Sequence, residues 1–97
     1  MGLGSHANVY NTCLRILRKR GFALRVEGEL GDDGCWPTEA RWIAEKDGFR
    51  FLADNPIELF GLVALQDHFQ PAEDIPYWWR QDGDDVWEEL MSAAFPD

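Results

Sequence analysis

Long apolar runs are missing from this 97-residue chain. The longest, Leu59–Leu65, has seven residues, whereas a helix needs about 20 to cross a bilayer, so we expect no membrane span. The first residues contain no basic stretch that leads into an apolar run, which favours a cytoplasmic protein over a secreted one. We expect residues 1–6 to be disordered or a remnant of cloning, followed by a single domain.

Cysteine is also scarce, and neither Cys13 nor Cys35 belongs to a Cys-x-x-Cys pair. Two free thiols in a reducing compartment are expected, because a disulfide would call for export. A zinc site would need both cysteines together with His6 and His68, four ligands from unrelated parts of the chain. We therefore expect no metal and no other cofactor.

The motifs of common catalytic sites are absent. There is no Gly-x-Ser-x-Gly, no phosphate-binding loop and no His-Glu-x-x-His, and the only serines are Ser5 and Ser92. His68 next to a carboxylate would make a general base, but a histidine near a helix end is more often a surface residue. The sequence predicts that the protein is not an enzyme.

Basic residues are almost confined to the first half of the chain. Residues 1–50 contain eight basic and seven acidic residues, whereas residues 51–97 contain one basic residue, Arg80, and eleven acidic ones. The two halves carry net charges of +1 and −10, which together give −9. Such a field repels nucleic acid and anionic lipid and attracts basic surfaces, although solubility alone is a simpler explanation.

The first element expected is a helix with one apolar face, built on Val9, Cys13, Ile16 and Leu17. Its last turns are basic, as suits the negative end of a helix dipole, and Gly21 is expected to end it in a left-handed conformation. Phosphate binding by these basic residues is the alternative.

Three strands in an antiparallel meander are expected next. Alternation predicts a strand over residues 22–30, a turn at 31–34, and a second strand over 38–46 that places Ala40, Trp42 and Ala44 inward. Asp47-Gly48 predicts a tight hairpin, followed by a strand with Phe49, Phe51 and Ala53 inward.

Two further helices complete the expected fold. Asn55-Pro56 predicts the start of a central helix that runs to Phe69, is apolar around nearly its whole circumference and is covered on more than one side. A last amphipathic helix, capped by Asp84 or Asp85, is expected to dock on the core. The fold class is therefore α+β, in the order α-β-β-β-α-α, with helices mainly on one face of the sheet.

The order α-β-β-β-α is similar to that of the double-stranded RNA-binding domain. That family contacts phosphates with a lysine-rich start of its second helix, where this chain has Asn55-Pro56-Ile57-Glu58 preceded by Asp54. We therefore expect no nucleic-acid binding of that kind.

The run Asp82-Gly83-Asp84-Asp85 suggests calcium, but Val86 stands where an EF-hand needs a third oxygen ligand. Helix capping explains these aspartates without a metal.

The segment from Pro76 to Arg80 is the most informative for function. Neighbours in an extended chain point to opposite sides, so one of Trp78 and Trp79 is expected to cover the central helix and the other to lie at the surface. Tyr, Trp and Arg are enriched in binding hot spots, although all of these side chains together would also serve to hold the last helix on the core.

The run Asn55–Leu65, followed by Pro71 and Tyr77-Trp78-Trp79-Arg80, resembles a pattern in small uncharacterised bacterial proteins. The resemblance covers about a quarter of the chain, implies a bacterial, intracellular protein and carries no known activity.

Two functions follow as expectations. The first is an acidic protein–protein interaction domain, an inhibitor or immunity-type partner of a basic protein; the second is a small-molecule-binding module with a pocket beside Tyr77–Arg80. The oligomeric state is left open. The candidate binding residues are Tyr77, Trp78, Trp79, Arg80, Asp82, Asp84 and Glu88.

Overall fold

The computed structural model describes residues 2–29 and 40–96. Its elements confirm the expected α+β class and the order α-β-β-β-α-α. The expected turn at 31–34 and the ends of two strands at 30 and 38–39 lie outside the described residues. The elements are α1 (Ala7–Lys19), β1 (Ala23–Glu27), β2 (Arg41–Lys46), β3 (Phe49–Ala53), α2 (Pro56–Phe69) and α3 (Val86–Ala94).

The sheet is the expected antiparallel meander, with β2 between β1 and β3. Asp47 and Gly48 join β2 to β3 with φ angles of 51° and 86°, as a primed two-residue turn requires. The side chains of Phe49, Phe51 and Ala53 are buried, which confirms the inward face expected for β3. The first strand is shorter than its alternating pattern, because pairing with β2 ends at Glu27.

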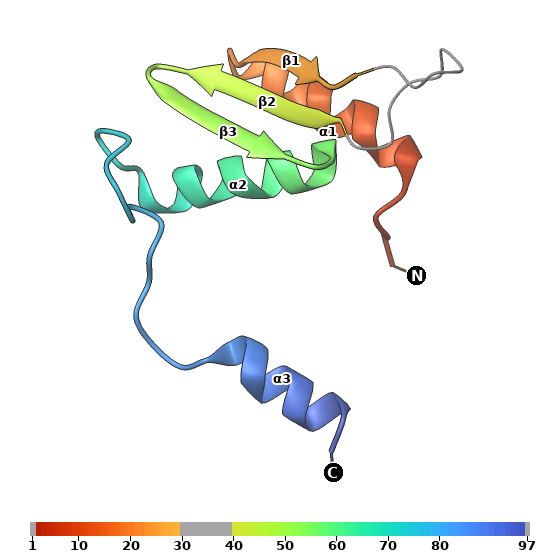
Figure 1. The fold of residues 1–97 in the computed structure, drawn as a ribbon, viewed down its shortest axis with the longest axis vertical. Helices are drawn as coiled ribbons and strands as arrows, with labels where there is room; N and C mark the ends of the chain where they lie inside the picture. Colours follow the sequence, from red (N-terminus) through yellow and green to blue (C-terminus); the bar gives the residue numbers. More distant parts are fainter. Residues whose placement is uncertain (1, 30–39, 97) are drawn as a thin grey trace.

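Helices α1 and α2 pack side by side against one face of the sheet, α1 near β1 and α2 near β3 (Figure 1). The resulting two-layer core is apolar throughout, and no buried side chain of the described residues is polar or charged. Its cluster consists of Leu17, Phe22, Ala44, Phe49, Phe51, Ala53, Leu59 and Val63.

Local signals set the ends of both packed helices. His6, at the end of the segment expected to be disordered, caps α1 by accepting a 3.2 Å hydrogen bond at Nδ1 from the Asn8 amide. Gly21 follows α1 with a φ of 94°, which is the left-handed stop expected there. Asn55 caps α2 as expected, because its Oδ1 accepts a 2.9 Å bond from the Glu58 amide.

Helix α2 is buried on fewer sides than its apolar residues predict. Leu59 and Val63 are buried against the sheet and α1, but Leu65 is 39% exposed and Ala64 faces solvent. The expectation that α2 is covered on more than one side is therefore met only in part.

The expected docking of the last helix is wrong. Helix α3 has no buried residue and packs extensively against no other described helix or strand. Figure 1 shows it at the end of an extended segment, separate from the sheet and the two packed helices. The radius of gyration of the Cα atoms is accordingly 16.4 Å, whereas a compact domain of this length has about 12.5 Å.

Candidate functional site

The segment between α2 and α3 positions the aromatic residues singled out in the sequence. Helix α2 ends at Gln70, whose left-handed backbone turns the chain back towards the sheet. Two further turns follow, closed by hydrogen bonds from the Trp78 amide to the Ile75 carbonyl at 3.4 Å and from the Arg80 amide to the Tyr77 carbonyl at 3.0 Å. These turns present Trp78 and Trp79 in different directions.

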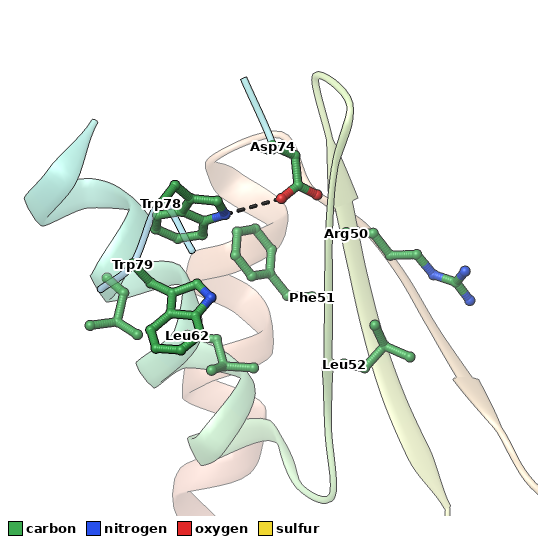
Figure 2. Close-up of a pocket in the computed structure, with 8 residues that line it drawn as sticks. Arg50, Phe51, Leu52, Leu62, Asp74, Trp78 and Trp79 are labelled. Carbon is green, nitrogen blue, oxygen red and sulfur yellow. Dashed lines mark hydrogen bonds between the residues drawn. The ribbon is translucent and has the colours of Figure 1, made fainter. Parts of the chain in front are cut away.

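Trp78 is the tryptophan that covers the core. Its ring meets those of Phe49 and Phe51 edge-on, with centroids 6.1 Å and 6.3 Å away. Its indole N–H donates a 3.0 Å hydrogen bond to Asp74, which fixes the ring over Phe51 (Figure 2). Trp78 therefore packs the segment between α2 and α3 against β3, and the hydrogen-bonding capacity of its indole N–H is satisfied by Asp74.

Trp79 is the surface member of the pair, as the sequence predicts for one of the two. It is 50% exposed, and its ring contacts that of Tyr77, itself 67% exposed, with centroids 5.9 Å apart. Tyr77 has a φ of 63°, an uncommon backbone conformation for a residue with a side chain. The two rings form an exposed aromatic pair, which we call the aromatic ledge.

A hollow of about 430 Å³ lies where this ledge meets β3 and α2. Figure 2 shows Trp78, Trp79 and Leu62 on the same side of β3 as Phe51, whereas Leu52 projects from the other side of the strand. Leu65 also lines the hollow. Its volume falls within the usual range for small-molecule pockets, about 300–1,000 Å³. Most of its lining is apolar, with Arg50 and Asp74 as its charged members.

The acidic candidates do not gather at this hollow. Asp82 lies 3.5 Å from the Arg80 guanidinium in an exposed ion pair, and Asp84 is exposed in the extended segment. Glu88 is on α3, where it accepts a 3.1 Å hydrogen bond from Ser92. The structure thus brings Tyr77, Trp78 and Trp79 together and places the carboxylates further along the chain.

Helix α3 carries a second group of exposed apolar side chains, which the sequence reasoning assigned to the core. Trp87 is 69% exposed and Leu90 63%. Asp85 caps the helix through a 3.0 Å bond from the Glu88 amide, so at least this aspartate has the capping role expected for the acidic run. The exposed apolar residues of this helix and its end are Val86, Trp87, Leu90, Met91 and Phe95.

On the other side of the molecule, α1 and β1 enclose a cationic groove of about 240 Å³ that the sequence analysis missed. Of the described residues, none forms an ion pair with Arg15 or Arg18, whereas Arg25 pairs with Glu45 and Glu27. The hydrogen bond that the Arg25 guanidinium donates to the Glu45 carboxylate is the main cause of a raised pKa for Arg25. We call this the α1–β1 groove; it is lined by Asn11, Leu14, Arg15, Arg18, Leu24, Arg25, Val26 and Trp42.

Within 2–29 and 40–96, no three histidine, cysteine or carboxylate side chains come close enough to hold a metal ion. Cys35 lies outside the described part, and Cys13 is a buried free thiol. No described helix combines the length and apolar character needed to cross a membrane.

No protein-family model, curated protein or solved structure matches this chain. The resemblance to small bacterial proteins therefore stays a prediction.

Proposed function

We propose that this chain is a small acidic protein–protein interaction domain that binds a protein with a basic surface, as an inhibitor or immunity-type partner does. The observation that carries the proposal is α3, a formed helix whose apolar face is exposed among carboxylates. A helix of nine residues is too short to be stable in water by itself, so its apolar face needs a contact that the chain's own core does not provide.

The two exposed aromatic groups would act as anchors in such a contact. Trp79 and Trp87 each offer a large ring of low conformational entropy, and residues of this type dominate binding hot spots. The carboxylates of Asp82, Asp84 and Glu88 would steer a basic partner during encounter and add less to the lifetime of the complex. We expect this binding to take place in the cytoplasm, where the Cys13 thiol stays reduced.

The experiment is capture of the partner from a lysate of the source cell at about 50 mM salt, identification by mass spectrometry, and kinetics with the purified partner. We expect Trp79→Ala or Trp87→Ala to weaken binding by about 2 kcal/mol through faster dissociation. Asp82→Asn, Asp84→Asn and Glu88→Gln together should slow association and flatten its salt dependence. Ile16→Ala, at an exposed position of α1 that lines neither the hollow nor the acidic end, is the control. A partner whose binding all of these variants leave unchanged would refute the proposal.

The hollow beside Trp78 and Trp79 supports a second candidate function, a small-molecule-binding module. Its volume and its apolar lining are the specific observation in favour. Capture of an apolar ligand there would respond little to ionic strength, whereas association through the acidic end weakens as salt rises. Leu62→Trp would fill the hollow and block a ligand while leaving α3 untouched.

A further inference from the structure

The apolar face of α3 has acidic edges. Trp87 and Met91, like Val86 and Leu90, are four residues apart and so lie on one side of the helix. At 100° per residue, Glu88 borders this stripe on one side and Glu89 on the other, because both lie about 60° beyond its apolar limits. The face therefore suits a surface that is apolar in the middle and basic at its rim.

The α1–β1 groove is such a surface. Its floor is apolar, with Leu14 and Leu24 partly buried and Val26 50% exposed. Arg15 and Arg18 stand at the rim, exposed and without a carboxylate partner among the described residues. Among the described residues, no acidic side chain lines the groove, whereas Asp74 lines the hollow beside Trp79.

The two surfaces also agree in length. The groove follows α1 from Asn11 to Arg18, about 10 Å at 1.5 Å per residue, and the nine residues of α3 extend about 13 Å. We propose that α3 of one copy docks in the α1–β1 groove of a second copy, so that two chains exchange their C-terminal helices in a symmetric dimer. The inference rests on the proposed function, because it names as partner a second copy of this chain, which offers a locally basic groove on a protein of net charge −9.

The short connection between Trp79 and α3 opposes docking of α3 in the groove of its own chain. Trp79 lies at the β3 side of the molecule, whereas the groove is at β1, on the far side of β2. Residues 80–85 span at most about 20 Å when fully extended. A path over the helical layer would have to pass α2 and then α1, each about 10 Å across, and would use all of this length before α3 could lie alongside β1. Figure 1 shows α3 on the α2 side, away from β1.

Charge favours the exchange over a pairing of two α3 helices, and the exposed area is large enough for a dimer. Two α3 helices packed together would bring Glu88 and Glu89 of both copies close to one another, which like-charge repulsion opposes. The chain exposes 8201 Å², whereas a compact monomer of 11.2 kDa exposes about 5,700 Å². This excess surpasses the roughly 800 Å² per partner that a standard interface buries, so a dimer has ample surface to bury.

Sedimentation equilibrium of the full chain, from about 1 µM to about 500 µM, tests the proposal. We expect a monomer–dimer equilibrium that weakens at least about tenfold between about 50 mM and 500 mM salt. Arg18→Glu should weaken dimerisation by about tenfold or more. Its matched control, Lys19→Glu, makes the same change of charge at the next position, outside the groove, and should have a clearly smaller effect. A chain that stays monomeric at low salt up to the highest concentration would overturn the inference.

A mixing experiment identifies the two surfaces. The groove variant Arg15→Glu/Arg18→Glu keeps α3 intact, and the helix variant Trp87→Ala/Leu90→Ala keeps the groove intact. Each should be monomeric alone, and an equimolar mixture should form heterodimers at the highest concentrations, because α3 of the first fits the groove of the second. These heterodimers should be weaker than the wild-type dimer, because they make only one of the two exchanged contacts. Circular dichroism melts of both variants show that each is folded.

The remaining outcomes each contradict the exchange. A dimer that survives in the groove variant but not in the helix variant indicates pairing of α3 with α3. Two monomeric variants whose mixture stays monomeric exclude docking in a second copy. If the chain is monomeric yet binds a basic protein through Trp79, the proposed function stands and this inference fails. If the chain dimerises as described but binds no other basic protein, the reverse holds.

Discussion

The clearest energetic prediction concerns the two adjacent tryptophans, which the structure assigns to different tasks. Trp78 is partly buried, meets Phe49 and Phe51 edge-on, and donates a hydrogen bond to Asp74. Trp79 touches Tyr77 and is 50% exposed. Replacement by Ala therefore removes core packing in the first case and mainly surface contacts in the second.

The magnitudes follow from the contacts. Trp→Ala in a core costs about 3–5 kcal/mol, and each aromatic pair contributes about 0.5–1.5 kcal/mol beyond the buried area. Since Trp78 keeps some exposure, we expect Trp78→Ala to lower the free energy of unfolding by about 3 kcal/mol. We expect Trp79→Ala to lower it by about 1 kcal/mol or less, because exposed side chains contribute little.

Urea unfolding followed by far-ultraviolet circular dichroism is the assay, because fluorescence would lose one of its own reporters in each variant. A domain of this size has a total stability of about 5–10 kcal/mol, so a loss of 3 kcal/mol is easily resolved. Equal losses in the two variants would refute the division of tasks. Trp78→Phe, which keeps an aromatic ring but loses the bond to Asp74, should lie between wild type and Trp78→Ala.

Three further predictions address the packed body and are checked by the same urea titrations. Asn55→Ala should cost about 1 kcal/mol, because the Glu58 amide loses its acceptor, and Asn55→Ser should restore most of it. Val63→Asp should abolish cooperative unfolding, because a charge would enter a site that is 1% exposed, whereas Ala64→Asp on the solvent side of α2 should remain folded. Gly21→Ala should cost about 1 kcal/mol through strain at a φ of 94°, and a neutral result would show that α1 ends differently.

Much of the packed body could be predicted because its signals are local. Asn55 and Pro56 specify a helix start whatever surrounds them, and Asp47-Gly48 specifies the turn that aligns Phe49 with Lys46. The inward face of β3 follows from alternation alone.

The errors share a different physical origin. The spacing of Trp87 and Leu90 shows that α3 has an apolar face, but a pattern on one helix carries no information about which molecule covers it. For the same reason, the apolar circumference of α2 predicts that other elements bury the helix on several sides, whereas Leu65 on this helix is 39% exposed. Which of Trp78 and Trp79 faces the core depends on the turn at Tyr77, whose positive φ has no sequence signal.

The α1–β1 groove was missed because it is assembled from two elements. Arg15 and Arg18 were explained by their place near the end of a helix, an explanation that holds for a helix in isolation. Only the packing of β1 and Trp42 beside them turns these arginines into the rim of an apolar groove. The outward pairing of Arg25 with Glu45 is likewise a product of the register between β1 and β2.

The central claim is that α3 serves contacts with another molecule and not the folding of its own chain. The most direct test is the free energy of unfolding of the wild type and of Trp87→Ala/Leu90→Ala, measured side by side at about 1 µM protein, where association is minimal. The account predicts that the two values agree within about 0.5 kcal/mol, because neither side chain is buried in the monomer. A loss of about 3 kcal/mol or more in the double variant would mean that α3 packs on its own core, and would contradict the account.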